Sequence, residues 1–307
     1  MPKIENNKIW AIAGGKGGVG KSLISSNLSV NLAKQGYNVV LIDADFGGSN
    51  LHTFLGVNSS KISLSDFIRH PELKLEDILL PTGIPNLRLA SGAHDVLGMA
   101  RPNAMQVSKL VKAIKSMHAD YVLIDLGAGS PPYILDLFLI ADTGILVSAP
   151  EPTSVENTYL FVKSAFYRKL RTVIQHPEVR GYLEWITENK DENMPRTPAD
   201  LISKITKINR HAGDALKYEI SQFVPKLILN QIRTPSDARI GFSMRQACAK
   251  HFGISLSYVG FIEQDNAVIQ SIRLRKPALL YAPESKASCS IDRIAQNLRQ
   301  DYHLIPT

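Results

Sequence analysis

The sequence predicts an α/β fold in which helices cover both faces of a mainly parallel sheet. Short apolar, β-branched runs alternate with helical patterns along the 307 residues, which is typical of repeated strand–helix–strand units. These runs are almost continuously apolar, as expected for strands buried on both faces. The alternation is interrupted once and then resumes, so we predict a single domain spanning residues 1–307.

The elements follow one another in a regular order. Seven short apolar runs predict strands at Ile9–Ala13, Val39–Ile42, Leu87–Ala90, Tyr121–Ile124, Gly144–Val147, Leu227–Leu229 and Tyr258–Ile262. Apolar residues at helical spacing between them predict helices at Lys21–Lys34, Ala104–Met117, Pro132–Ile140, Ser154–Arg171, Ser236–His251, Asn266–Arg273 and Lys286–Gln300. Phe161, Phe166 and Tyr167 recur at helical spacing and are expected in the core.

One stretch, from about residue 167 to residue 223, breaks the alternation. It contains no convincing strand and is basic and helical in character. Thr197, Pro198 and Asp200 are typical of a helix start, with a cap, a first-turn proline and an early acid. We therefore predict a helical insertion over about residues 167–223, between two strands of the same domain.

Composition excludes several classes of protein. Apolar residues make up 44% of the chain and charged residues 21%, as in ordinary globular proteins. The two cysteines, Cys248 and Cys289, argue against a disulfide scaffold and favour a reducing cytosol, and both are expected to be buried. No leader is evident at the first residues, and no apolar run approaches the ~18 residues of a membrane span. A cytoplasmic protein is expected, with peripheral attachment to a membrane or nucleoid left open.

The net charge of +7 is unevenly distributed. Residues 1–159 carry 13 Lys and Arg against 14 Asp and Glu, whereas residues 160–226 carry 12 against 8 and residues 227–307 carry 10 against 6. This excess permits contact with nucleic acid or an anionic membrane, although a solvated basic face is the simpler interpretation. The candidate contacts are Lys163, Arg168, Lys169, Arg171, Arg273, Arg275 and Lys276.

A phosphate-binding loop lies between the first strand and the first helix. Gly15, Gly20, Lys21 and Ser22 satisfy the GxxxxGK[ST] pattern. The glycines let backbone N–H groups surround phosphates, and the helix N-terminus adds partial positive charge. Lys21 can reach the β- and γ-phosphates, and the Ser22 hydroxyl can bind Mg²⁺. The predicted binding residues are Gly15, Gly17, Gly18, Val19, Gly20, Lys21 and Ser22, and the predicted cofactors are ATP and Mg²⁺.

Carboxylates follow two predicted strands. Asp43 and Asp45 come at the end of one, and Asp125 ends another just before the flexible segment 126–129. In a parallel sheet with a phosphate loop, these strand ends are where Mg²⁺ and an attacking water are held. A lone Asp there would more often be a helix cap, but three of them beside this loop indicate a hydrolytic site.

The loop from Gly15 to Ser22 resembles the deviant Walker A motif of the MinD/ParA family. The mark is a second lysine, Lys16, at the start of the loop. The resemblance implies that Lys16 reaches the nucleotide of a partner subunit, so that ATP drives dimerisation. It also implies that Asp45 orients the attacking water, while Asp43 lies near the metal and Asp125 matches the Walker B aspartate.

The resemblance extends over roughly residues 8–160 and 225–285. Residues 150–154, Pro-Glu-Pro-Thr-Ser, resemble a segment of MinD-like and flagellar-placement members. Asn230 matches the asparagine that binds adenine, and Asp265 lies on the loop that closes over the base. Gly127 and Glu263 stand where the family usually has proline. MinD proper ends in a membrane-binding helix, whereas residues 291–298 lack a bulky aromatic face and are expected to pack on their own domain.

The resemblance implies a slow, partner-stimulated ATPase that acts as a spatial regulator of cell division, flagellar placement or partitioning. A DNA-partition ATPase that binds nonspecific DNA is an alternative. A metabolic or metal-cluster enzyme on the same scaffold is another, although no CxxC pair is available to hold a cluster.

Overall fold

The computed structural model describes residues 7–58, 62–92, 101–173, 179–181 and 198–305. It contains an eight-stranded sheet in the order β3-β4-β2-β5-β1-β6-β7-β8. Every neighbouring pair is parallel except β3 and β4, which are antiparallel. The predicted α/β class with a mainly parallel sheet is confirmed.

All seven predicted strands are present. They are β1 (Lys8–Gly14), β2 (Val39–Ala44), β4 (Leu87–Ala90), β5 (Tyr121–Ala128), β6 (Thr143–Ser148), β7 (Lys226–Ile232) and β8 (Ser257–Glu263). The eighth strand, β3 (Leu79–Pro81), was not predicted. It is a three-residue edge strand that ends in proline and is only partly buried, so it carries none of the apolar signal of a central strand.

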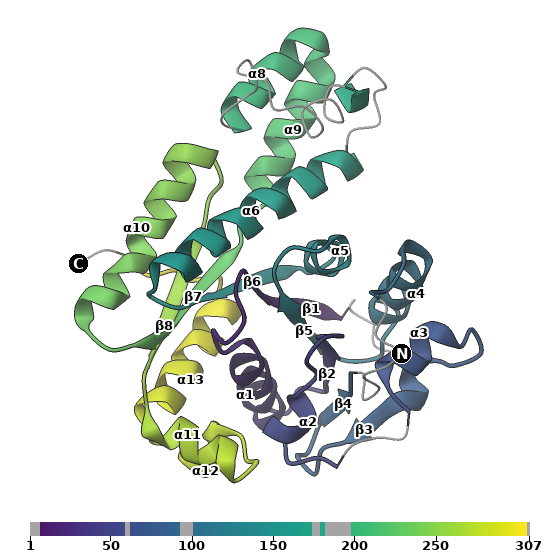
Figure 1. The fold of residues 1–307 in the computed structure, drawn as a ribbon, viewed down its shortest axis with the longest axis vertical. Coiled ribbons are helices and arrows are strands. Elements are labelled where there is room, and N and C mark those ends of the chain that lie inside the picture. Colours follow the sequence, from purple (N-terminus) through teal and green to yellow (C-terminus); the bar gives the residue numbers. More distant parts are fainter. Residues whose placement is uncertain (1–6, 59–61, 93–100, 174–178, 182–197, 306–307) are drawn as a thin grey trace.

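Helices cover both faces of the sheet (Figure 1). One face carries α3 (Leu64–Arg69), α4 (Ala104–Lys115), α5 (Pro132–Leu139), α6 (Pro152–Val173) and α10 (Pro235–Phe252). The other carries α1 (Lys21–Lys34), α2 (Leu51–Phe54), α11 (Asn266–Arg273), α12 (Ala278–Tyr281) and α13 (Lys286–Arg299). Alternate residues of β1 enter the two cores, with Ala11 on one side and Ile12 on the other. The predicted coverage of both faces is confirmed.

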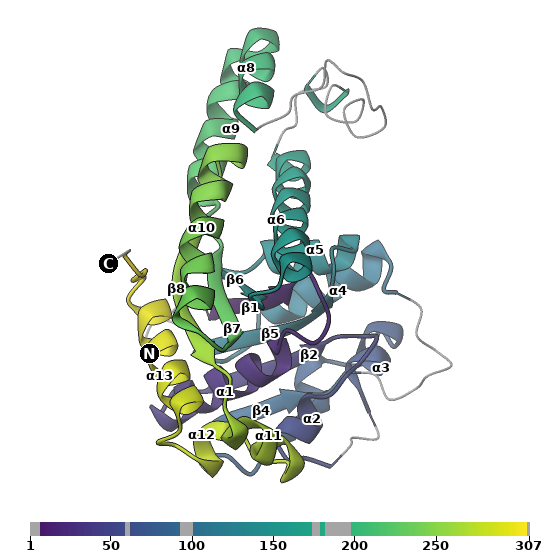
Figure 2. The ribbon, with the colours of Figure 1, turned by 60° about the vertical axis from the view of Figure 1, so that its left-hand side comes forward.

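The described residues between β6 and β7 form helices, and the helical insertion over about residues 167–223 stays a prediction. This range holds the C-terminal part of α6, then α8 (Pro198–Ile208) and α9 (Arg210–Gln222), while residues 174–178 and 182–197 lie outside the described part. The expected start at Tyr167 falls inside α6, a continuous helix. Figures 1 and 2 show α8 and α9 extending away from the sheet. The assignment of residues 1–307 to a single domain stays a prediction.

Ion pairs attach α6 to its neighbours. The Arg168 guanidinium donates two hydrogen bonds to Asp136 on α5, at 2.7 and 2.8 Å. The Lys169 ammonium lies 3.1 Å from the Glu219 carboxylate on α9. Two of the four cations on α6 that were candidates for contact with DNA are therefore neutralised within the chain. Phe161 and Phe166 are buried in the core, as expected from their spacing.

The last helix, α13, packs on its own domain, as the sequence predicts. Ile291, Ile294, Ala295 and Leu298 are buried in the core beneath the sheet. Cys248 is buried as expected, but the same expectation for Cys289 is wrong, because Cys289 lies on the exposed side of α13. None of the helices in the described residues is long and apolar enough to cross a membrane.

Candidate nucleotide-binding site

The phosphate loop joins β1 directly to α1. β1 ends at Gly14 and α1 begins at Lys21, with no side chain capping the N-terminus of α1. The first-turn N–H groups of α1 therefore have no side-chain acceptor and, together with the helix dipole, favour an anion at this position. α1 is buried along most of its length, so the sheet and the helices around it fix its orientation.

Two loop glycines are required by close contacts. A Cβ on Gly15 would lie 2.3 Å from the carbonyl oxygen of Asn157 on α6. Gly20 has a φ of 95°, and a Cβ there would lie 2.1 Å from the Asn230 side-chain nitrogen. That nitrogen donates to the Val19 carbonyl at 2.8 Å. Side chains at these positions would displace the loop, so both glycines are needed for its shape.

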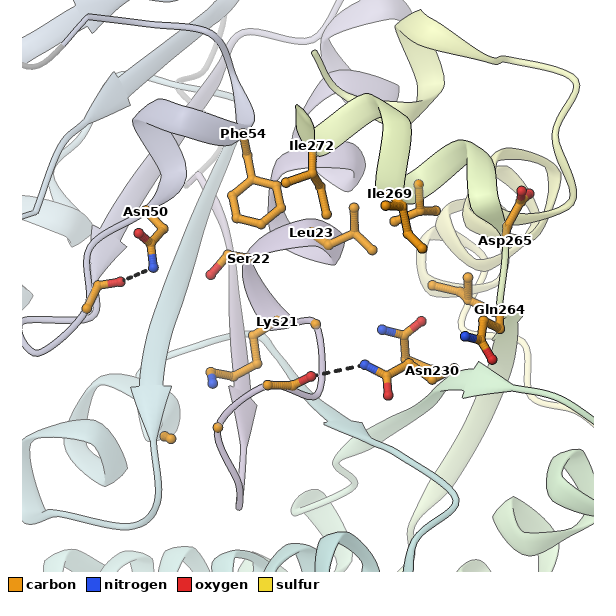
Figure 3. A pocket seen from close by; sticks show the side chains of 18 of the residues that line it. Lys21, Ser22, Leu23, Asn50, Phe54, Asn230, Gln264, Asp265, Ile269 and Ile272 are labelled. Carbon is orange, nitrogen blue, oxygen red and sulfur yellow. Dashed lines mark hydrogen bonds between the residues drawn. The ribbon is translucent and has the colours of Figure 1, made fainter. Parts of the chain in front are cut away.

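A cavity of about 560 Å³ opens over the loop (Figure 3). Lys21, Ser22 and Asp45 lie at its polar end, with Gly17, Gly18 and Gly20. Its other side is apolar and consists of Leu23, Phe54, Val268, Ile269 and Ile272. The volume falls within the range of about 300–1,000 Å³ that is usual for small-molecule sites. A polar end and an apolar wall suit a ligand with phosphates at one end and a flat base at the other.

Asp125 is buried next to Ser22 and does not itself line the cavity. It accepts a hydrogen bond from the Ser22 hydroxyl, while its Oδ1 has no partner among the described residues. Burial, together with the nearby Asp43 carboxylate, raises the pKa of Asp125 to about 8, against the lowering effects of the Ser22 hydrogen bond and of Lys21. An orphaned carboxylate oxygen beside a serine hydroxyl fits Mg²⁺, which prefers oxygen ligands and binds proteins through few side chains. Ser22 and Asp125 would hold it.

Asp43 has an anchoring role that the sequence did not indicate. Its Oδ2 accepts from the Ser49 hydroxyl at 2.7 Å and from the Asn50 and Leu51 N–H groups at 3.1 Å each. Its Oδ1 accepts from the Asp45 N–H at 3.3 Å. Burial raises the pKa of Asp43 to about 6 in spite of these bonds. Both oxygens are engaged in holding residues 45–51, so the predicted metal role stays a prediction.

The Asp45 carboxylate faces the cavity from a niche lined by glycines. Its Oδ1 accepts from the Gly47 N–H at 3.1 Å. A Cβ on Gly127 would lie 3.1 Å from the same oxygen. The absence of proline at position 127 therefore leaves room for the carboxylate of Asp45. This places Asp45 beside the phosphate end of the cavity, where an attacking water would lie.

Lys16 points away from its own phosphate site. Its Nζ lies 3.1 Å from the Glu151 carboxylate and 3.1 Å from the Thr153 hydroxyl, at the start of α6. The side chain is 41% exposed. It is absent from the residues that line the cavity, in contrast to Lys21. The two lysines of the loop thus have different environments within one chain.

The predicted base-binding residues also line the cavity, and polar atoms of both form hydrogen bonds within the chain. Asn230 holds the Val19 carbonyl, as described above. Asp265 begins α11 by accepting from the Ala267 N–H at 2.8 Å, and it accepts from the Ala287 N–H at 3.1 Å. Gln231, which the sequence did not single out, donates to the Gly18 carbonyl at 3.0 Å and has a φ of 63°. Only its position next to Asn230 could have indicated it.

Several known proteins are similar to this chain in sequence. Residues 5–173, more than half of the chain, match a family model described as "ParA: NUBPL iron-transfer P-loop NTPase". The protein is a member of the MinD/ParA family of P-loop NTPases. Among curated relatives, the antiactivator FleN of Pseudomonas aeruginosa is 26% identical over 95% of this chain and 86% of its own length. The flagellum site-determining protein YlxH of Helicobacter pylori is 27% identical over 94% and 81%.

Other relatives match the N-terminal half or the fold. The septum site-determining protein MinD of Synechocystis is 35% identical over 49% of this chain and 56% of its own length. The structure of MinD from Pyrococcus horikoshii, complexed with Mg-ADP, superposes with a TM-score of 0.64 at 23% identity, covering 95% of this chain and 96% of that one. This P-loop NTPase thus shares its fold with MinD.

Replacing Asp43 by alanine is expected to destabilise the protein. Three N–H groups and one hydroxyl in a partly buried place would lose their acceptor, which costs about 1–3 kcal/mol for each donor that stays buried without a partner. The measurement is urea unfolding followed by circular dichroism. Asp66→Ala is the matched control, because Asp66 is partly exposed and, among the described residues, bonds only to Ser63, the N-cap of α3, so its loss should cost less. Equal stability of Asp43→Ala and the wild type would contradict the anchoring role.

Asp125→Asn is expected to stabilise the nucleotide-free protein at high pH. The folded-state pKa of Asp125 is about 8, above its ordinary value of 3.8, so folding favours the protonated form. Wild-type stability is therefore lost as pH rises from 4 to 8, with a slope of up to about 1.4 kcal/mol per pH unit. Denaturant titrations at several pH values should show the advantage of Asp125→Asn growing over this window. A constant difference between the two proteins would refute this pKa assignment.

Proposed function

We propose that this protein is an ATP-dependent switch that binds Mg·ATP as a dimer and hydrolyses it slowly. The observation that carries this proposal is the polar end of the cavity, where Lys21 and Ser22 lie at the uncapped start of α1 and Asp125, with its orphaned oxygen, is buried next to Ser22. The backbone N–H groups and Lys21 would bind the phosphates, and Ser22 and Asp125 would hold Mg²⁺. When bound, Mg²⁺ would neutralise charge that develops on the β- and γ-phosphates.

Hydrolysis is assigned to Asp45. Its carboxylate lies at the phosphate end of the cavity, held by the Gly47 N–H, and can accept a hydrogen bond from a water molecule. A water oriented in this way would attack the γ-phosphate from the side opposite the leaving group. The loop that carries Asp45 is fixed by the buried Asp43, so the two carboxylates have separate duties.

Dimerisation is assigned to Lys16. Since Lys16 is paired with Glu151 and Thr153 of its own chain, it is available to a second subunit only when those contacts break. A γ-phosphate presented by the partner would compete with Glu151 for the ammonium group. ATP would then favour the dimer because the contact between Lys16 and the γ-phosphate exists only there.

The biological role we propose is spatial regulation in the cytoplasm, with a protein partner that stimulates hydrolysis. FleN and YlxH, whose names refer to antiactivation and to the flagellum site, resemble the chain over most of its length. MinD of Aquifex aeolicus has been solved as a MinC:MinD complex and shares the fold at a TM-score of 0.62. The ion pairs of Arg168 and Lys169 favour this role over binding of nonspecific DNA along α6.

Phosphate release from Mg·ATP tests the enzymatic part of the proposal. We expect slow turnover of ATP, measured with a coupled phosphate assay, and none when EDTA removes Mg²⁺. Lys21→Ala, purified in parallel, controls for contaminating ATPases. A wild-type preparation that neither binds nor hydrolyses Mg·ATP would reject the proposal.

A further inference from the structure

An exposed apolar surface lies on α11, α12 and the residues that connect them. Thirteen large hydrophobic side chains are exposed among the described residues, and five of them fall between residues 269 and 281. Leu274 is 58% exposed, at the tip of the connection. We call the group formed by Ile272, Arg273, Leu274, Arg275, Lys276, Leu280 and Tyr281 the α11–α12 surface. Clusters of this kind are uncommon on monomers and mark interaction sites.

The same surface is strongly basic. Arg273, Arg275 and Lys276 are all exposed, and residues 266–283 include no Asp or Glu. Within the described part of the chain, none of these three cations is within ion-pair distance of a carboxylate. The exposed charges of Arg273 and Lys276 are therefore available to a binding partner.

The tip of this surface is held rigidly. Arg275 adopts a left-handed backbone, with a φ of 52°, and its guanidinium donates to the Val57 carbonyl at 3.2 Å. The Arg275 carbonyl oxygen packs so closely on Gly56 that a Cβ there would lie 2.6 Å away. The Lys276 N–H donates to Ser271 at 2.9 Å and closes the turn. The backbone around Leu274 is thus ordered before binding, which lowers the ordering cost of binding.

The position of the surface on the molecule leaves it open. Figures 1 and 2 both place α11 and α12 at the end of the molecule opposite α8. The C-terminal helix α13 cannot supply such a surface, because its apolar residues are buried in the core. Ile269 and Ile272 partly face the nucleotide cavity, but Leu274, Leu280 and Tyr281 do not line it.

We propose that the α11–α12 surface binds an anionic lipid bilayer. Leu274, Leu280 and Tyr281 would enter the boundary between headgroups and acyl chains, while Arg273 and Lys276 would contact lipid phosphates. A nucleic-acid surface explains these residues less well, because phosphate contacts there are made by polar and cationic groups and leave exposed leucines without a role. A lipid bilayer accounts both for the exposed apolar side chains and for the cations that, within the described part of the chain, have no carboxylate partner.

Co-sedimentation of the full chain with vesicles tests this proposal. Vesicles of phosphatidylglycerol and phosphatidylcholine should bind the protein, and vesicles of phosphatidylcholine alone should bind it much less. The assay is run with Mg·ADP and with Mg·ATP, so that its result does not depend on the proposed hydrolysis or dimerisation. If the protein fails to bind the anionic vesicles both with Mg·ADP and with Mg·ATP, the lipid proposal is overturned and the ATPase proposal stays intact.

Paired variants identify the surface. The double variant Arg273→Gln and Lys276→Gln should partition onto the anionic vesicles about 25-fold less, because each cation near an anionic surface contributes about fivefold. Leu274→Ser with Leu280→Ser should reduce it at least about tenfold. Lys112→Gln with Lys115→Gln, on exposed positions of α4, and Met105→Ser are the matched controls and should bind as the wild type does.

Two results would overturn the assignment. One is vesicle binding by both surface variants at the level of the controls. The other is binding of duplex DNA, at the same salt concentration, that is lost with Arg273→Gln and Lys276→Gln but kept with the leucine variants, since this would identify a nucleic-acid surface. Thermal melting of each variant confirms that it is folded, and all substituted side chains are exposed.

Discussion

Asp45→Ala is expected to lower the rate of ATP hydrolysis by about 10²–10³-fold while leaving Mg·ATP binding nearly unchanged. The substitution removes the acceptor that orients the attacking water, and general acid–base catalysis by a positioned side chain contributes about 10²–10⁴-fold to the rate. Binding is retained because Lys21, Ser22 and the loop backbone remain in place. Single-turnover hydrolysis and calorimetric titration measure the two quantities separately.

The control for this experiment is Asp120→Ala, a carboxylate at the other end of β5 that holds the Asn38 N–H. It should hydrolyse ATP at the wild-type rate. An Asp45→Ala protein with undiminished turnover would remove Asp45 from catalysis, and a loss of binding together with turnover would indicate a role in holding the nucleotide instead.

Lys16→Ala is expected to weaken ATP-dependent dimerisation by more than about 100-fold. A charge-assisted contact to a phosphate buried between two subunits is the kind of interaction whose loss costs most at an interface. Sedimentation velocity with Mg·ATP, in the slow-hydrolysing Asp45→Ala background, should give a monomer when Lys16 is replaced and a dimer when it is not. Nucleotide binding by the monomer should persist, because Lys21 alone reaches into the cavity.

Glu151→Gln is the companion variant. It removes the carboxylate that holds Lys16 within its own chain, so dimerisation should occur at lower ATP concentrations than in the wild type. If Lys16→Ala still forms the ATP-induced dimer, the contact across the interface is not made by this lysine.

The sequence predicted those parts of the molecule that depend on short-range signals. A central strand such as β5 is buried on both faces and so reads as a continuous apolar run. Gly20 was recognised from the GxxxxGK[ST] pattern, and its left-handed backbone and close contact with Asn230 explain why no side chain fits there. The strand ends also converged as expected, since Asp43 and Asp125 are aligned partners on adjacent strands.

Features that depend on tertiary contact were missed. The edge strand β3 has only three residues and forms through antiparallel pairing with β4, for which no local sequence pattern exists. Asp43 resembles a metal ligand in sequence, yet folding turns it toward the Ser49, Asn50 and Leu51 donors. The pairing of Lys16 with Glu151 joins residues 135 positions apart and could not be read from the loop alone.

The most direct test of the switch is a crystal structure of the Asp45→Ala protein with Mg·ATP. Two chains should face each other across their cavities, with each Lys16 Nζ released from Glu151 and bound to the γ-phosphate in the opposite subunit. A nucleotide-loaded structure in which Lys16 stays on Glu151 and no second chain meets the γ-phosphate would contradict the proposed mechanism.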